Sequence, residues 1–184
     1  MGDSLPIDSP EHLLEIAQLR LNDLTPINNL VIKGNRIIID SLIIQLSPIV
    51  MMVWRYLARK KTNNCEKTDN TQCSGCTGCY ISHQNMIEEI DTELLDEYAH
   101  ITGKNSESYR VFSEKLNALK TDARGWDEKD VSIRQYRSKL KKELKEKAPY
   151  SLRDQLVPDI IEDDSGTAMF GLKLARNTIK FNDK

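Results

Sequence analysis

The chain has 184 residues with 26 basic and 28 acidic side chains, which give a formal net charge of −2. Apolar residues make up 39% and charged residues 29%, and there are only 8 Gly and 6 Pro. This length and composition are typical of one soluble globular domain and exclude a fibrous or disordered chain. The balanced charge excludes a global attraction to nucleic acid or membranes, so a partner of either kind must be inferred from local charge.

The first residues carry no targeting signal. Residues 1–10 have neither the basic stretch nor the apolar stretch of a secretion signal, so we expect a cytoplasmic protein. The most hydrophobic segment, residues 37–57, is interrupted by polar side chains and by Pro48. We therefore expect this segment to be buried core, and we expect no membrane partner.

The beginning of the chain predicts a helix. Ser9 and Pro10 are a typical helix start, because serine caps a helix N-terminus and proline suits the first helical position. Apolar residues follow at helical spacing. Residues 1–27 therefore predict an N-terminal helical extension, and residues 28–184 predict the main domain.

A small sheet and a second helix are predicted next. The turn at Gly34 separates two apolar runs, which predicts a β-hairpin over residues 30–39. Residues 42–46 predict a third short strand. A helix over residues 49–61 follows, since its apolar residues recur at helical spacing.

The rest of the chain predicts three helices and a terminal hairpin. Apolar residues recur at helical spacing over residues 82–102, 106–121 and 130–147. Two apolar runs, residues 156–161 and 168–174, predict strands joined by a turn. The predicted fold class is therefore α+β, with a small sheet before the helices and a hairpin after them.

Charge is segregated along the second half of the chain. Residues 81–108 hold seven acidic side chains and one basic side chain, whereas residues 129–153 hold nine basic and three acidic side chains. Such segregation within one domain predicts a dipolar surface, one face of which suits an anionic partner.

All four cysteines lie in the polar, Cys-rich loop predicted at residues 62–80. They are Cys65, Cys73, Cys76 and Cys79. Four thiolates suit a tetrahedral zinc ion, and the Cys-x2-Cys-x2-Cys run also suits a [4Fe–4S] cluster. Two disulfides are disfavoured without a secretion signal. We expect zinc as the cofactor, with a [4Fe–4S] cluster as the alternative, in a structural or redox-sensing site.

His83 follows this loop closely and leaves two interpretations open. It could replace one of the four cysteines as a metal ligand. It could instead be a surface histidine near the start of a helix, which is the interpretation that we favour.

The basic helix predicted at residues 130–147 has a candidate nucleic-acid face. Its predicted core stripe is Ile133, Tyr136, Leu140 and Leu144. With this stripe turned inward, a set of polar and basic side chains points outward or to the flank. Arginine, glutamine and serine reach base edges, and lysines suit phosphates. The predicted set is Arg134, Gln135, Ser138, Lys141, Lys142 and Lys145, extended from the terminal hairpin by Lys173, Arg176 and Lys180. The alternative is a solvated lysine-rich face with internal pairs such as Glu143 with Lys147.

The order of these elements predicts a winged helix-turn-helix. In that fold the recognition helix precedes the hairpin wing, and here the basic helix occupies that position. Several short strings support the same fold by their order and spacing. They are Leu30-Val31-Ile32, Ile37-Ile38-Ile39, Gln45-Leu46-Ser47-Pro48, Trp54-Arg55-Tyr56-Leu57-Ala58-Arg59, Glu97-Tyr98-Ala99-His100-Ile101-Thr102-Gly103, Tyr136-Arg137-Ser138-Lys139-Leu140-Lys141-Lys142-Glu143-Leu144, Ala148-Pro149-Tyr150 and Phe170-Gly171-Leu172-Lys173-Leu174.

Together these strings resemble the C-terminal winged-helix domain of the CRISPR-associated ring-nuclease family, with gaps, over about residues 28–181. Members of that family typically carry an N-terminal CARF domain that binds cyclic oligoadenylate. Nothing before residue 28 resembles that domain, so the family's nuclease activity is not carried over. The resemblance implies a winged-helix fold, a type III CRISPR context, and a nucleic-acid-binding or regulatory role.

We therefore expect a non-catalytic protein that binds DNA or RNA or acts as a regulatory subunit. The sequence has no Gly-rich phosphate loop, no nucleophile elbow and no His-x-Glu signature followed by cysteines. Two alternatives remain open. The chain could be an interaction module that forms a homodimer or docks a CRISPR effector or CARF-domain protein, or an iron–sulfur regulator that senses redox state.

Overall fold

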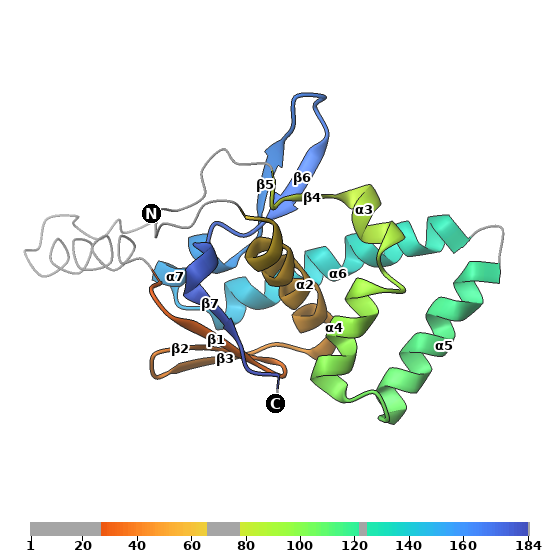
Figure 1. The fold of residues 1–184 in the computed structure, drawn as a ribbon, viewed down its shortest axis with the longest axis horizontal. Coiled ribbons are helices and arrows are strands. Elements are labelled where there is room, and N and C mark those ends of the chain that lie inside the picture. The colour runs from red at the N-terminus through yellow and green to blue at the C-terminus, as the bar shows by residue number, and fades with distance from the viewer. Residues whose placement is uncertain (1–26, 66–77, 122–124, 184) are drawn as a thin grey trace, which may run out of the picture.

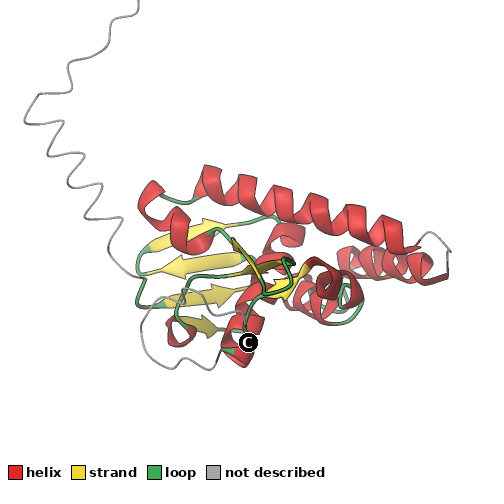
Figure 2. Ribbon diagram, turned by 90° about the horizontal axis from the view of Figure 1, so that it is seen from above, coloured by secondary structure: helices red, strands yellow, loops and turns green. Residues whose placement is uncertain are grey.

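The computed structural model describes residues 27–65, 78–121 and 125–183. The helical extension predicted for residues 1–27 lies outside the described residues, apart from Ile27. The fold is α+β, as predicted. Figures 1 and 2 show the strands of the first sheet at one end of the molecule and helix α5 at the other end, with helix α6 spanning the distance between them.

The first sheet contains the three predicted strands and a fourth one. Strands β1 (Leu30–Lys33), β2 (Arg36–Ile39) and β3 (Leu42–Gln45) form an antiparallel meander. Strand β7 (Ile179–Phe181) lies parallel to β1 and completes the order β3-β2-β1-β7. The β1–β2 turn requires Gly34, whose φ of +54° is in the left-handed region that favours glycine.

Helix α2 (Pro48–Asn64) is the central helix of the domain. It packs against helices α4 and α6, and its middle turns are buried on all sides, so that even Trp54 and Arg55 are inaccessible to solvent. The indole Nε1 of Trp54 donates to the carbonyl oxygen of Leu156 at 2.9 Å, which satisfies the buried N–H group. The predicted helix over residues 49–61 is therefore present and slightly longer than expected.

The single helix predicted over residues 82–102 is wrong, because the structure has two helices there. Helix α3 (His83–Glu88) and helix α4 (Glu93–Thr102) are separated by a break at residues 89–92. At this break the Glu89 carboxylate accepts from Tyr56 Oη at 2.7 Å and from Lys60 Nζ at 2.8 Å. Contacts with α2 thus fix a bend that the hydrophobic spacing along one helix does not reveal.

The α5–α6 pair follows the prediction closely. Helix α5 (Glu107–Thr121) and helix α6 (Gly125–Lys147) pack against each other. The predicted inward stripe of α6 is confirmed, since Ile133, Tyr136, Leu140 and Leu144 are all buried. Helix α6 starts five residues earlier than the 130–147 range that the sequence predicts.

The second sheet contains the predicted terminal hairpin and one more strand. Strand β5 (Asp159–Glu162) pairs with strand β6 (Ala168–Gly171), which also pairs with the two-residue strand β4 (Ile81–Ser82). The sheet order is β4-β6-β5. Figure 1 shows the β5–β6 hairpin projecting from the helical body.

The chain on either side of this hairpin differs from the prediction. The predicted strand at 156–161 begins too early, since helix α7 (Tyr150–Leu156) lies immediately before it. After the hairpin, a short 3-10 turn (Arg176–Thr178) leads into β7, so the terminal segment joins the first sheet. Among the described residues, no helix combines the length and the apolar character needed to cross a membrane.

Candidate nucleic-acid interface

The outer face of α6 presents the side chains that the sequence predicts. Ser138 and Gln135 are exposed, and so are all the predicted cations of this helix. Those cations are Arg134, Lys141, Lys142 and Lys145. Seven basic and two acidic side chains occupy residues 134–147, so this part of the helix carries an excess of positive charge.

The acidic side chain Glu143 is turned away from this outer face. Its carboxylate accepts from the backbone N–H of Ser47 at 3.0 Å and from the Ser47 hydroxyl at 2.5 Å, at the N-terminus of α2. Lys147 Nζ also donates to it at 3.0 Å, which confirms the predicted Glu143–Lys147 pair. Burial tends to raise the pKa of Glu143, but the hydrogen bonds from Ser47 and Lys147 outweigh it and hold the pKa below its usual value.

The outer cations of α6 are only weakly neutralised. Arg134 pairs with Asp130 at 2.9 Å, and Lys142 lies 3.9 Å from Glu146. Lys141 and Lys145 form no ion pair with another described residue. Exposed pairs of this kind stabilise a protein by less than about 1 kcal/mol, so an anionic ligand can compete for these cations.

A cavity of about 220 Å³ lies between α6 and the β5–β6 hairpin. Its apolar lining residues come from several elements, and its charged lining residues all come from α6. The apolar lining residues are Leu57, Met86, Leu140, Pro158, Ile160 and Phe170, and the polar ones are Arg134, Arg137, Ser138 and Lys141. Among the described residues, the lining therefore contains three cations and no carboxylate.

Arg137 is the functional candidate that the sequence analysis did not identify. Its guanidinium carbon lies 3.2 Å from the centroid of the Phe170 ring, and its Nη1 donates to Nδ1 of His83 at 3.0 Å. It forms no ion pair with a carboxylate among the described residues. Burial, reinforced by the nearby Arg134, lowers the pKa of Arg137 to about 10. The sequence does place Arg137 one helical turn from both Arg134 and Lys141, and this spacing could have identified it as a member of the same basic cluster.

His83 is engaged by both of its ring nitrogens. Because Arg137 donates to Nδ1, the imidazole proton lies on Nε2, which donates to Asp130 at 2.7 Å. The hydrogen bond from His83 is the main cause of the lowered pKa of Asp130. Both ring nitrogens of His83 therefore contact protein groups, and the contact at Nδ1 orients the Arg137 guanidinium.

The terminal hairpin does not extend the basic patch as expected. Arg176 donates to the carbonyl oxygen of Cys65 at 3.0 Å, and Lys180 lies on β7 of the other sheet. Lys173 Nζ lies 3.5 Å from Asp159 Oδ1, so it is partly neutralised by the neighbouring strand, and its contact with nucleic acid stays a prediction.

The turn of this hairpin is acidic. Glu162, Asp163 and Asp164 follow one another there, and Asp163 Oδ1 accepts from the backbone N–H groups of Ser165 and Thr167. The hydrogen bonds from Ser165 and Thr167 lower the pKa of Asp163. The hairpin therefore contributes apolar side chains to the cavity and negative charge at its tip.

Two of the four cysteines lie in the described residues, and they share one buried cluster. Cys65 and Cys79 are buried together with Tyr80. The fully buried Lys61 donates from Nζ to Cys79 Sγ at 3.5 Å. Cys73 and Cys76 lie outside the described residues. Within the described ranges, no three side chains of the metal-ligating types converge on one point.

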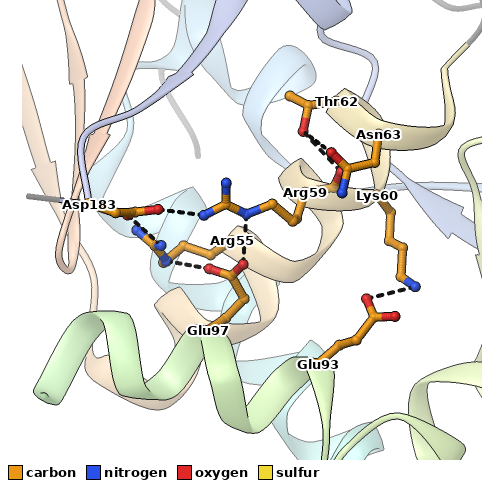
Figure 3. Close-up of polar contacts among 8 residues, drawn as sticks. All are labelled: Arg55, Arg59, Lys60, Thr62, Asn63, Glu93, Glu97 and Asp183. Carbon is orange, nitrogen blue, oxygen red and sulfur yellow. Dashed lines mark hydrogen bonds and ion pairs between the residues drawn. The ribbon is translucent and has the colours of Figure 1, made fainter. Parts of the chain in front are cut away.

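A ring of two arginines and two carboxylates ties the end of the chain to the helices (Figure 3). Arg55 and Arg59 on α2 each donate from Nε to Glu97 at 2.8 Å and from Nη2 to Asp183, at 2.7 Å and 2.5 Å respectively. The Arg59 guanidinium also lies 3.4 Å from the centroid of the Phe181 ring. The charges of the ring balance and its members are engaged with one another, so we assign it a structural role.

Comparison of the chain with known protein families, with curated proteins and with solved structures found no match.

Proposed function

We propose that the protein binds DNA or RNA through the outer face of α6 and acts as a regulatory or targeting subunit, with no catalytic step assigned to the chain. The observation that supports this proposal is the combination of exposed cations on residues 134–147 with the inward turn of Glu143. Phosphate contacts by lysine and arginine supply most of the affinity of nucleic-acid-binding proteins. The alternative interpretation, in which these lysines only interact with solvent, does not explain why an apolar cavity lies beside them.

We also propose that the domain is a winged helix. Three features support this fold: the sheet order β4-β6-β5, the position of α6 before the β5–β6 hairpin, and the packing of α6 against α2. In winged helices the recognition helix precedes the hairpin in the same way. The type III CRISPR context rests on the resemblance of the sequence strings alone.

The four cysteines support a zinc site, with a [4Fe–4S] cluster as the alternative. Cys65 and Cys79 bring two thiols to one buried place, where Lys61 adds a buried positive charge. A buried ammonium group compensates the negative charge of a thiolate-bound metal. Zinc bound by these two residues together with Cys73 and Cys76 would stabilise the loop between α2 and β4.

Elemental analysis and an absorption spectrum of anaerobically purified protein test the metal. One zinc per chain and no visible absorption would support the structural site. A brown protein with about four irons per chain would replace zinc with the cluster, because thiolate–iron charge transfer absorbs in the visible range. Protein free of both metals, with four titratable thiols in the folded state, would contradict the proposal.

A triple charge reversal tests the nucleic-acid interface. Replacing Arg134, Lys142 and Lys145 with Glu is expected to weaken binding of DNA and RNA strongly, and to reduce the slope of log K against log salt concentration by about 2 to 3 wherever residual binding can be measured. The matched control reverses Lys33, Arg36 and Lys180 on the first sheet, where all three are exposed, and so changes the net charge equally. Equal losses in the two variants would mean that α6 is not the binding face.

A protein-interaction module is the second candidate. It is favoured by three large apolar side chains that are about half exposed on the α5–α6 pair, namely Val111, Trp126 and Val131. Large apolar side chains that are exposed to solvent are candidate contacts for a protein partner. Sedimentation analysis distinguishes this candidate, since a dimer that Trp126→Ala dissociates would support it over nucleic-acid binding.

A further inference from the structure

We propose that the cavity between α6 and the β5–β6 hairpin holds one unstacked base of a single-stranded nucleic acid, while Arg134 and Lys141 hold the phosphates on either side of it. This inference rests on the proposed function and specifies its ligand. It assigns to Arg137 the role of the surface on which the base stacks.

The size and lining of the cavity suit one flat ring system. Its volume of about 220 Å³ is below the roughly 300–1,000 Å³ of pockets that enclose whole small molecules. Leu140, Pro158 and Phe170 are among the residues that give it apolar walls. A base has two apolar faces and polar edges, so it can bury its faces here and keep its edges near the open side, where Ser138 and Lys141 lie.

The unbalanced charge of Arg137 indicates an anionic or aromatic ligand. This guanidinium is half-buried, and its described contacts are a neutral imidazole nitrogen and an aromatic ring. Burying a cation without an anionic partner costs stability, and such costs are typical of binding sites. Arginine planes are common stacking surfaces for unpaired bases, and the contacts with His83 and Phe170 hold this plane in a fixed position.

The positions of the outer cations suit a phosphate backbone. Arg134 and Lys141 are seven residues apart on α6, which is about 10 Å along the helix axis, and Arg137 lies between them. Both side chains line the cavity. The phosphate on each side of a bound base can therefore contact its own cation, while the nucleic-acid backbone continues along the helix.

Two features favour a single strand over a duplex. In a duplex the bases are stacked, and only their edges are accessible in the grooves, so no base can enter an apolar cavity. The adjacent hairpin ends in Glu162, Asp163 and Asp164. Like charges repel, so these acids disfavour the second phosphate backbone that a duplex would bring to the hairpin. An acidic peptide that inserts an apolar side chain is the competing occupant.

Binding of three fluorescent ligands to the full chain tests the inference: a single strand, a duplex of the same length, and an abasic single strand with the same phosphates. We expect the single strand to bind at least about tenfold more tightly than the abasic strand, which is the usual contribution of base stacking. Equal affinity for the two strands, or tighter binding of the duplex, would overturn the inference.

Substitutions that fill the cavity test base binding separately from the phosphate binding that the proposed function requires. Ser138→Phe fills the cavity from an exposed position without a change in charge. Asn117→Phe is the matched control, because Asn117 is exposed on α5 and does not line the cavity. Ser138→Phe is expected to remove the preference for bases while it keeps the salt dependence, and Asn117→Phe is expected to change neither. Arg137→Lys, which keeps the charge and loses the stacking plane, is expected to act like Ser138→Phe.

The outcomes are distinguishable. If the triple charge reversal on α6 strongly weakens binding and Ser138→Phe leaves the preference for bases intact, the cavity inference fails and the proposed function stands. If no nucleic acid binds the unmodified chain, both fail. If a peptide of glutamates around one phenylalanine binds, and Ser138→Phe abolishes its binding while no single strand binds, the peptide is the occupant and the inference is wrong.

Discussion

Arg55, which is completely buried on α2, donates to Asp183 at 2.7 Å across 128 positions of sequence. Asp183 also accepts from Arg59, and both arginines meet Glu97 on α4. The end of the described chain is thus fixed to the central helix by an ion network rather than by a long strand. Because β7 has only three residues, we infer that this network is what holds it beside β1.

Replacing Asp183 with Ala is expected to lower the free energy of unfolding by about 3 kcal/mol. This is near the lower end of the cost of removing one partner of a buried ion pair, because both arginines keep Glu97 and the Asp183 side chain is itself 22% exposed. Urea unfolding measures the change. Asp96→Ala is the control, since this exposed carboxylate lies 3.8 Å from Lys104 and its loss should change stability by less than about 0.5 kcal/mol. Equal effects of the two substitutions would contradict the role of the network.

The same carboxylate makes stability depend on acidic pH. Burial tends to raise the pKa of Asp183, but the hydrogen bonds from Arg55 and Arg59 outweigh it and hold the pKa below its usual value. The folded state therefore holds the proton less tightly than the unfolded state does, so the stabilisation is complete above about pH 4 and disappears as the pH falls through the folded-state pKa. Below pH 4 the unmodified protein is expected to lose stability more steeply than Asp183→Asn in chemical unfolding at a series of pH values. Parallel curves would show that this carboxylate does not contribute.

Much of the fold follows from local pattern. Gly34 and its flanking apolar runs predict the β1–β2 hairpin, and the stripe of Ile133, Leu140 and Leu144 predicts the buried side of α6. In both places the period of the hydrophobic residues matches the element that buries them. The outward side chains of α6 are correctly predicted for the same reason.

The elements that escape prediction depend on contacts distant in sequence. The apolar run that precedes Pro158 resembles a strand, yet Leu156 is the last residue of helix α7. The carbonyl oxygen of Leu156 accepts a hydrogen bond from the indole of Trp54. The break between α3 and α4 is fixed by Glu89, which meets α2. Arg137 was missed because it lies at the edge of the buried stripe, where only the position of Phe170 on a later strand identifies its partner.

Glu143 is expected to contribute to stability without contributing to binding. Glu143→Ala removes the acceptor for the N–H and hydroxyl groups of Ser47 at the start of α2, which should cost about 1 kcal/mol, as the loss of a helix cap does. The substitution also removes a negative charge near the outer face of α6, so affinity for nucleic acid should stay the same or rise. Glu146→Ala is the control, because Glu146 lies 3.9 Å from Lys142 and is exposed. A loss of affinity in Glu143→Ala would assign the carboxylate to the binding face.

Lys61 is expected to tune the affinity of the proposed zinc site. Four thiolates and one zinc ion carry a net charge of roughly −2, and a negative charge of this kind is costly to bury unless a cation lies nearby. Lys61 is fully buried and its Nζ lies 3.5 Å from the Cys79 sulfur. Lys61→Met keeps the length of the side chain and removes its charge.

We expect Lys61→Met to weaken zinc binding by about 10- to 100-fold, the usual effect of removing a group that contacts a metal ligand. Competition with a chromophoric chelator measures this change, and circular dichroism checks that the variant is folded. Lys60→Met is the matched control, because the neighbouring ammonium group pairs with Glu89 and Glu93 and with neither of the two described cysteines. If both variants bind zinc as tightly as the unmodified chain, Lys61 serves the packing of α2 rather than the charge of the site. If only Lys61→Met is weakened, the buried ammonium group and the thiolates act together, and the metal is coupled to the central helix of the domain.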